Sequence, residues 1–98
     1  MNLRLVDDRR FEGCSPSELL EADASWSDSA VLFVADRQAM ASAGYPVLCV
    51  DLVEQQGRSF RCAAAQVCGV ENNLSLANMG FEEFADNIDA DGVFRGFR

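Results

Sequence analysis

Ninety-eight residues with 49% hydrophobic and 24% charged side chains are enough for one domain, over residues 1–98, with a single hydrophobic core. The sequence contains no His and no Lys, so histidine bases, histidine metal ligands and Schiff-base lysines are excluded. Its net charge of −8 disfavours direct binding to the phosphate backbone of a nucleic acid.

The four cysteines are Cys14, Cys49, Cys62 and Cys68, and no pair of them has the C-x-x-C spacing of a common zinc site. We therefore predict no metal and no other cofactor. Cys49 and Cys62 lie in or beside apolar runs and are predicted to be buried thiols; a reactive thiol at Cys14 or Cys68 is the alternative. The start of the chain has no apolar stretch of signal length, so we expect a cytoplasmic protein that does not bind a membrane.

The first third of the chain predicts a strand, a helix and a loop. Residues 2–6 alternate like a strand. Residues 15–18, SPSE, form a capping box with proline at the first helical position, which predicts a helix to about Ala24. Residues 25–29 follow as a polar loop around Trp26.

Two apolar runs, residues 30–35 and 47–53, predict strands that are buried on both faces. Between them, Asp36 can cap a short helix that continues to Ala43 and is closed by Gly44. Because a helix links the two runs, we expect them to be parallel or crossover neighbours in one sheet.

The next segment predicts a hairpin and a short helix. The turn at residues 55–57 leads into an alternating strand at 58–63. Residues 64–68 predict a short helix that ends before Gly69.

Residues 70–97 carry the densest pattern of the chain. Two Asn-rich turns are expected first, followed by a helix that begins near Gly80, with Asn78 as the alternative cap. The buried face of this helix is predicted from the spacing of its apolar side chains, which are Phe81, Phe84, Ala85 and Ile88. A turn at residues 89–92 then precedes a short strand at 93–94.

Three segments of this region resemble the C-terminal signature of a small bacterial family of unknown function that is common in actinobacteria: ENNLSLANM at 71–79, FEEFAD at 81–86 and DGVFRGF at 91–97. Weaker likeness extends upstream to LVDD at 5–8, LFVADR at 32–37 and PVLCVDL at 46–52. The resemblance implies a fold but no activity, cofactor or catalytic residue. It also implies that relatives usually carry an additional strand and helix before the position of Met1.

Together these patterns predict an α/β or α+β domain with a mixed central sheet of about four or five strands and short helices packed against it.

Carboxylates follow three of the predicted strands. Asp7 and Asp8 follow the first, Asp36 follows the second and Asp51 lies late in the third. If they meet at one edge of the sheet, they form a candidate Mg²⁺ or carboxylate-based catalytic site. The start LRLVDD resembles a phosphoacceptor receiver domain, but that family requires a Lys on a late strand, and this chain has no Lys. Solvated turn residues are the simpler interpretation.

Residues 87–92 resemble the first half of an EF-hand loop, but the twelfth position is Arg98 in place of the bidentate Glu, so calcium binding is not predicted. The side chains of Glu71, Asn72 and Asn73 are candidate ligand or partner contacts, with turn and cap roles as the alternative.

Aromatic and basic side chains complete the set of candidates. Trp26, Phe94 and Phe97 are either partner anchors or core residues. Arg95 is a further candidate contact, although its acidic neighbourhood predicts pairing with a carboxylate of the domain.

We therefore expect a small interaction or accessory protein, for example an immunity-like protein that covers a basic partner protein. A Mg²⁺-dependent or carboxylate-based enzyme using the four Asp residues is the alternative. We also expect a homodimer, with residues 2–6 at its contact. A short chain of this kind can also come from a mobile gene cassette.

Overall fold

The computed structural model describes residues 30–53 and 57–97. The predicted strand at 2–6, the helix up to Ala24, the loop at 25–29 and most of the turn at 55–57 lie outside the described residues.

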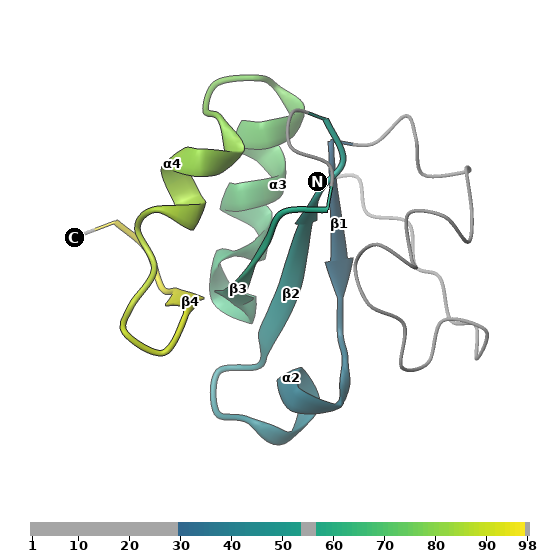
Figure 1. Ribbon diagram of the computed structural model, residues 1–98, viewed down its shortest axis with the longest axis vertical. Coiled ribbons are helices and arrows are strands. Elements are labelled where there is room, and N and C mark those ends of the chain that lie inside the picture. The colour runs from purple at the N-terminus through teal and green to yellow at the C-terminus, as the bar shows by residue number, and fades with distance from the viewer. Residues whose placement is uncertain (1–29, 54–56, 98) are drawn as a thin grey trace.

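Four strands form one sheet in the order β1-β2-β3-β4 (Figure 1). Their bounds are Val31–Val34 for β1, Pro46–Asp51 for β2, Ser59–Ala63 for β3 and Val93–Phe94 for β4. The β1–β2 and β2–β3 pairs are antiparallel, whereas β3 and β4 are parallel. The predicted mixed sheet with short helices is thus confirmed, as an α+β arrangement.

The expectation that β1 and β2 are parallel or crossover neighbours is wrong. They are antiparallel, with Val31 opposite Asp51 and Val34 opposite Leu48. The helix between them, α2 at Arg37–Ala41, has only five residues. It rises about 7.5 Å, which is too short to carry the chain back along a strand, so it turns the chain at the end of the sheet (Figure 1).

Asp36 caps α2 as predicted, because its Oδ1 accepts a hydrogen bond from the Ala39 backbone N–H at 3.0 Å. The helix ends before the predicted Ala43. Gly44 and Tyr45 follow with φ of 78° and 49°, and the Gly44 carbonyl accepts from the Ala64 N–H at 3.0 Å. This turn therefore fixes the start of β2 against the end of β3.

The helix after β3 is longer than the sequence indicates. A 3₁₀ turn at Ala64–Gln66 leads into α3 at Val67–Ser75, so the helix continues through Gly69. The predicted Asn-rich turn at residues 71–73 is therefore helix instead. A glycine inside a helix costs only about 1 kcal/mol, and the packing of Val70 and Leu74 against the core outweighs that cost.

Helix α4 spans Phe81–Ala85 and begins after Gly80, as predicted. It ends before Ile88, which is 41% exposed, so the predicted burial of Ile88 is wrong. The early end has a local cause: the Asn87 side-chain amide donates to the Glu83 carbonyl at 2.6 Å and the Asn87 backbone N–H donates to the Phe84 carbonyl at 3.0 Å. These bonds satisfy the last carbonyls of the helix.

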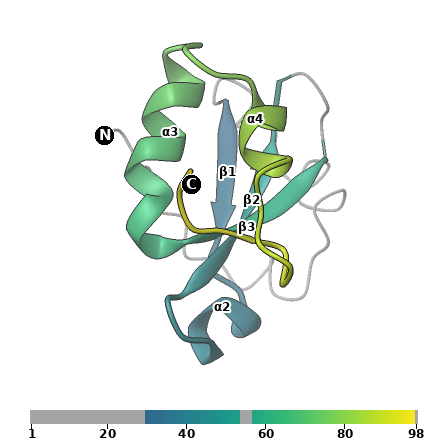
Figure 2. The same cartoon turned by 90° about the vertical axis from the view of Figure 1, so that its left-hand side faces the viewer.

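Helices α3 and α4 pack against the sheet, and Figure 2 shows them next to each other with β1 visible behind them. The core between these layers comes from the sheet residues Val31, Cys49, Phe60, Cys62 and Phe94 and the helical residues Val70, Phe81, Phe84 and Ala85. The Phe60 ring lies 5.0 Å from the Phe81 ring and 6.4 Å from both the Phe84 and the Phe94 ring.

Cys49 and Cys62 are both fully buried free thiols, as predicted. Burial raises the pKa of the Cys49 thiol, so this group stays protonated in the core. Cys68, on α3, is exposed. Among the described residues, every helix is too short or too polar to cross a bilayer.

Candidate functional site

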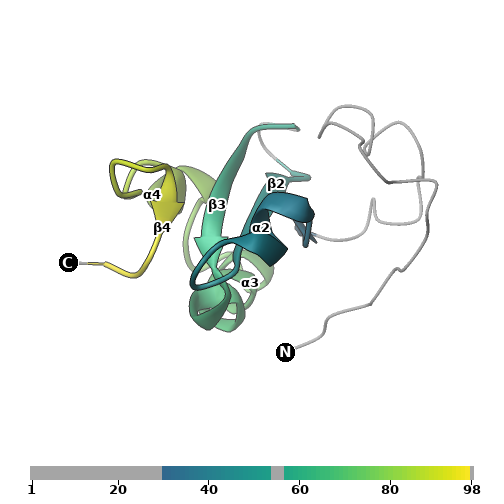
Figure 3. The same ribbon diagram turned by 90° about the horizontal axis from the view of Figure 1, so that it is seen from below.

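The most strongly charged segment of the described chain runs from α4 to β4. Its exposed carboxylates are Glu82, Glu83 and Asp86 on or just after α4, and Asp91 on the following turn, beside the half-buried Asp89. Figure 3 shows α4 and β4 together on the side of the molecule that carries the C-terminal segment. Glu82 and Glu83 occupy the first turn of α4, where the positive end of the helix dipole favours negative charge.

Arg95 pairs with both carboxylates of the turn between α4 and β4. Its Nη1 lies 2.8 Å from an Asp89 oxygen and 3.0 Å from Asp91 Oδ1, and its Nη2 lies 2.6 Å from Asp91 Oδ2. The predicted pairing of Arg95 with carboxylates is confirmed. The hydrogen bonds from Arg95 hold the pKa of Asp91 below its usual value. This arginine therefore stabilises the turn and is occupied by internal partners.

A second arginine lies against the end of α4. Arg58 Nη2 lies 3.0 Å from Asp86 Oδ1, and both side chains are partly exposed to solvent. Within the described residues, no ion pair involves Glu82 or Glu83. The uncompensated charge of this segment is thus concentrated on the first turn of α4.

A pocket of about 220 Å³ opens beside these glutamates, between the end of β2, the end of α3 and the start of α4. Its apolar walls are formed mainly by Val53, Leu74, Met79 and Phe81. Two carboxylate residues also line it: Asp51, which is only 2% exposed, and Glu83, which is exposed.

Backbone hydrogen bonds position both carboxylates. Asp51 Oδ1 accepts from the Val53 N–H at 2.9 Å, and Glu83 Oε2 accepts from the Gly80 N–H at 2.7 Å. The second bond is half of a capping box, which orders the first turn of α4. The remaining wall is the loop after α3, in which Ala77 has a φ of 57°.

The family of this chain follows from its sequence over almost its whole length. The family DUF6924, described as a domain of unknown function, matches residues 1–97. The chain belongs to the DUF6924 family. The predicted membership in a family of unknown function is confirmed at this level. Comparisons of this DUF6924 chain with curated proteins and with solved structures found no match.

The structure of the DUF6924 chain does not bring Asp36 and Asp51 together. Asp36 lies two residues beyond Val34, the last residue of β1, whereas Asp51 is paired with Val31, the first residue of β1. Asp7 and Asp8, the other two residues of the predicted carboxylate site, lie outside the described residues. Residues 30–53 and 57–97 contain no group of three His, Cys, Asp or Glu side chains placed to hold a metal ion.

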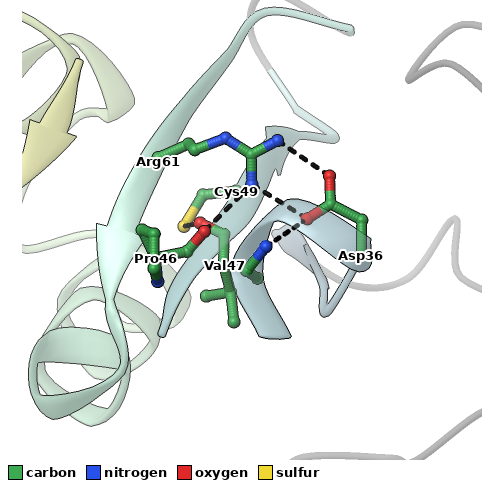
Figure 4. Close-up of polar contacts among 6 residues, drawn as sticks. Asp36, Pro46, Val47, Cys49 and Arg61 are labelled. Atoms are coloured by element: carbon green, nitrogen blue, oxygen red, sulfur yellow. Dashed lines mark hydrogen bonds and ion pairs between the residues drawn. The ribbon is translucent and has the colours of Figure 1, made fainter. Parts of the chain in front are cut away.

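Asp36 instead forms a two-pronged ion pair with Arg61 of β3 (Figure 4). The Asp36 oxygens lie 3.0 and 2.7 Å from Arg61 Nη1 and Nη2, and Arg61 Nη1 also donates to the Pro46 carbonyl at 2.9 Å. The hydrogen bonds from Arg61 lower the pKa of Asp36. The Asp36 carboxylate thus joins α2 to the sheet while also capping α2.

The predicted contact residues of the DUF6924 chain on α3 do not form one cluster. Glu71 is 9% exposed and accepts a hydrogen bond from Ser75 Oγ at 3.0 Å. The Asn73 side chain donates to the Gly69 carbonyl at 2.8 Å, while Asn72 is exposed. The side-chain bonds of Glu71 and Asn73 thus lie within α3.

Sequence reasoning missed the pocket and the role of Glu83 in it. The signal was available in part, because Glu at the third helical position after a Gly cap is typical of a capping residue. The apolar wall could not be foreseen, because Leu74 and Met79 belong to a stretch that was predicted to contain turns.

Proposed function

We propose that this DUF6924 domain is a small interaction or accessory module whose acidic face, formed by Glu82 and Glu83 on α4, covers a basic partner protein. The observation that carries the proposal is that these two exposed glutamates have no arginine partner among the described residues. Three of the four arginines in that part of the chain, Arg58, Arg61 and Arg95, already bind other carboxylates.

The charge of the whole chain supports the same partner class. A net charge of −8 creates a field that attracts a basic protein and repels nucleic acids. At physiological ionic strength the field is screened beyond about 8 Å, so the nearby glutamates contribute most to specific contact.

Exposed apolar side chains near the acidic face can provide the centre of an interface. Phe97 is 55% exposed, although its ring lies 5.6 Å from the Phe84 ring and 5.1 Å from the Phe94 ring. Ile88, just beyond α4, is 41% exposed. Protein interfaces commonly combine a central apolar contact with a charged rim. An immunity-like protein that blocks a basic toxin or enzyme is a concrete form of this module, and a cytoplasmic location is part of the proposal.

The first test is affinity capture from the source cells with three baits: the wild type, a variant with Glu82→Gln and Glu83→Gln, and a control with Asp89→Asn and Asp91→Asn. Both variants remove two negative charges, but the control removes them from residues that already pair with Arg95. Thermal melts establish that each bait is folded.

We expect one basic protein to be retained by the wild type and by the control but lost from the glutamine variant. The captured protein is then purified and the complex reconstituted, so that direct binding is measured. Retention of an acidic protein, or equal retention on all three baits, would contradict the proposal.

A further inference from the structure

Two exposed apolar side chains and one arginine form a corner of the molecule at α2. Met40 is 63% exposed, and Tyr45, in the turn that follows the helix, is 55% exposed. Arg37 is also exposed and lies three residues before Met40, so the two side chains share one face of α2. We call Arg37, Met40 and Tyr45 the α2 corner. Grouped apolar side chains on a surface are typical of a contact with another protein.

The α2 corner carries a positive charge that is not balanced within the described fold. The ion pairs of residues 30–53 and 57–97 use Arg58, Arg61 and Arg95, and none of them uses Arg37. Met, Tyr and Arg are enriched at protein interfaces. The corner therefore offers an apolar contact beside a cation, in a chain whose net charge is −8.

The pocket at the start of α4 suits an apolar side chain. Its volume of about 220 Å³ is sufficient, since an apolar cavity of about 150 Å³ can hold a benzene molecule. Asp51 offers an occupant little, because it is 2% exposed and already accepts from the Val53 N–H. Most of the lining is apolar and comes from Ala30, Val53, Leu74, Ala77, Met79 and Phe81.

Negative charge lies beside this apolar pocket. Glu82 and Glu83 occupy the first turn of α4, and the ion pairs of the described residues do not include them. Glu83 already bonds the Gly80 N–H, so Glu82 is the better partner for an incoming cation. An apolar side chain with an arginine next to it thus matches the pocket and its surroundings.

The α2 corner cannot reach the pocket of its own chain. Ala30, which lines the pocket, comes directly before β1, whereas α2 follows the other end of β1. Figure 1 shows α2 and the loop between α3 and α4 at opposite ends of the sheet. The four residues of β1 alone span about 13 Å. A contact between the corner and the pocket therefore needs two molecules.

We propose that the chain self-associates through this contact, with Met40 of one copy in the pocket of a second copy and Arg37 paired with Glu82 of that copy. Met suits the pocket because its unbranched side chain adapts to irregular apolar surfaces. Around a twofold axis the copies lie antiparallel, so that each dimer contains the contact twice. Because the contact uses Glu82, self-association competes with the basic partner of the proposed function.

Sedimentation equilibrium at about 0.15 M NaCl, where repulsion between the acidic chains is screened, measures the dimer dissociation constant. We expect Met40→Ser to raise this constant at least about tenfold, because each dimer loses the contact twice. Ile88→Ser is the matched control, since it removes an exposed apolar side chain that neither belongs to α2 nor lines the pocket. The control should change the constant less than about twofold. Thermal melts establish that each variant is folded.

Charge reversal tests the ion pair between the copies. Arg37→Glu alone should raise the dissociation constant at least about tenfold, and Glu82→Arg alone should do the same. The variant that carries both substitutions should return to within about threefold of the wild type, because the pair is then restored with opposite polarity. On dilution of the ¹⁵N-labelled wild type, the amide resonances of both Met40 and Met79 should shift.

The outcomes separate this inference from the proposed function. A wild-type monomer at all concentrations, a dimer that Met40→Ser does not weaken, or a double variant no better than Arg37→Glu would overturn the self-contact. If a basic partner binds the acidic face in that case, the proposed function stands without it. If the self-contact holds but no basic partner is captured, this inference stands and the proposed function fails.

Discussion

The replacement Phe84→Ala tests the packing that holds α4, and with it the acidic face, on the sheet. Phe84 is 2% exposed, and its ring lies 5.2 Å from the Phe94 ring and 6.4 Å from the Phe60 ring. Truncating a buried Phe removes its transfer free energy and leaves a cavity, which together lower the free energy of unfolding by about 3–5 kcal/mol. Since small domains have about 5–15 kcal/mol in total, the variant should be close to unfolding.

Phe97→Ala is the matched control. It removes the same side chain from a residue that contacts the same cluster but is 55% exposed, so we expect a loss of only about 1–2 kcal/mol. Urea denaturation followed by circular dichroism measures both variants. The reasoning is refuted if Phe84→Ala is no more destabilising than Phe97→Ala, because α4 would then not be anchored through its buried face.

Three further predictions concern acid stability, thiol access and assembly. Because Arg61 lowers the pKa of Asp36 in the folded state, the ion pair stabilises the fold above the unfolded pKa of about 3.9, and this stabilisation is lost as pH falls through the lower folded pKa. Asp36→Asn keeps a capping residue but removes the ion pair. It should therefore lower the free energy of unfolding at pH 7 and reduce the dependence of that free energy on pH between about pH 5 and 2. Iodoacetamide should label Cys68 in the native protein but Cys49 and Cys62 only after denaturation, and peptide mass spectrometry that finds native labelling of Cys49 would contradict the buried core. We also propose a twofold homodimer, for which light scattering on a sizing column should give a dimer mass at micromolar concentration; a monomer mass there and at tenfold dilution would contradict it.

Much of the fold could be predicted from local patterns. The predictions of a strand in the apolar run before Asp36 and of a helix cap at Asp36 were correct, because each depends on only a few neighbouring residues. The direction of β2 relative to β1 was wrong because it depends on how far a linking helix carries the chain, and periodicity does not give the length of α2. The continuation of α3 through Gly69 was missed because long-range packing of Val70 overcomes a weak local preference.

The site was less accessible to sequence reasoning. The carboxylates that follow successive strands are expected to meet only when those strands are parallel, and the antiparallel pairing places Asp36 and Asp51 at opposite ends of β1. The pairing of Arg95 with acids was predictable because Asp91 is four residues away and shares its turn. The pocket is lined by both Asp51 and Glu83, which are distant in sequence, so only the folded structure shows that they lie at the same pocket.

The most direct test of the proposed basic partner is isothermal titration calorimetry of the reconstituted complex, at low salt and at about 0.5 M NaCl. We expect binding to weaken strongly at high salt. At low salt, the variant with Glu82→Gln and Glu83→Gln should lose at least about tenfold in affinity, while the control with Asp89→Asn and Asp91→Asn should stay close to the wild type. An affinity that is independent of salt, or that falls equally in both variants, would contradict the claim that the acidic face of α4 covers a basic protein.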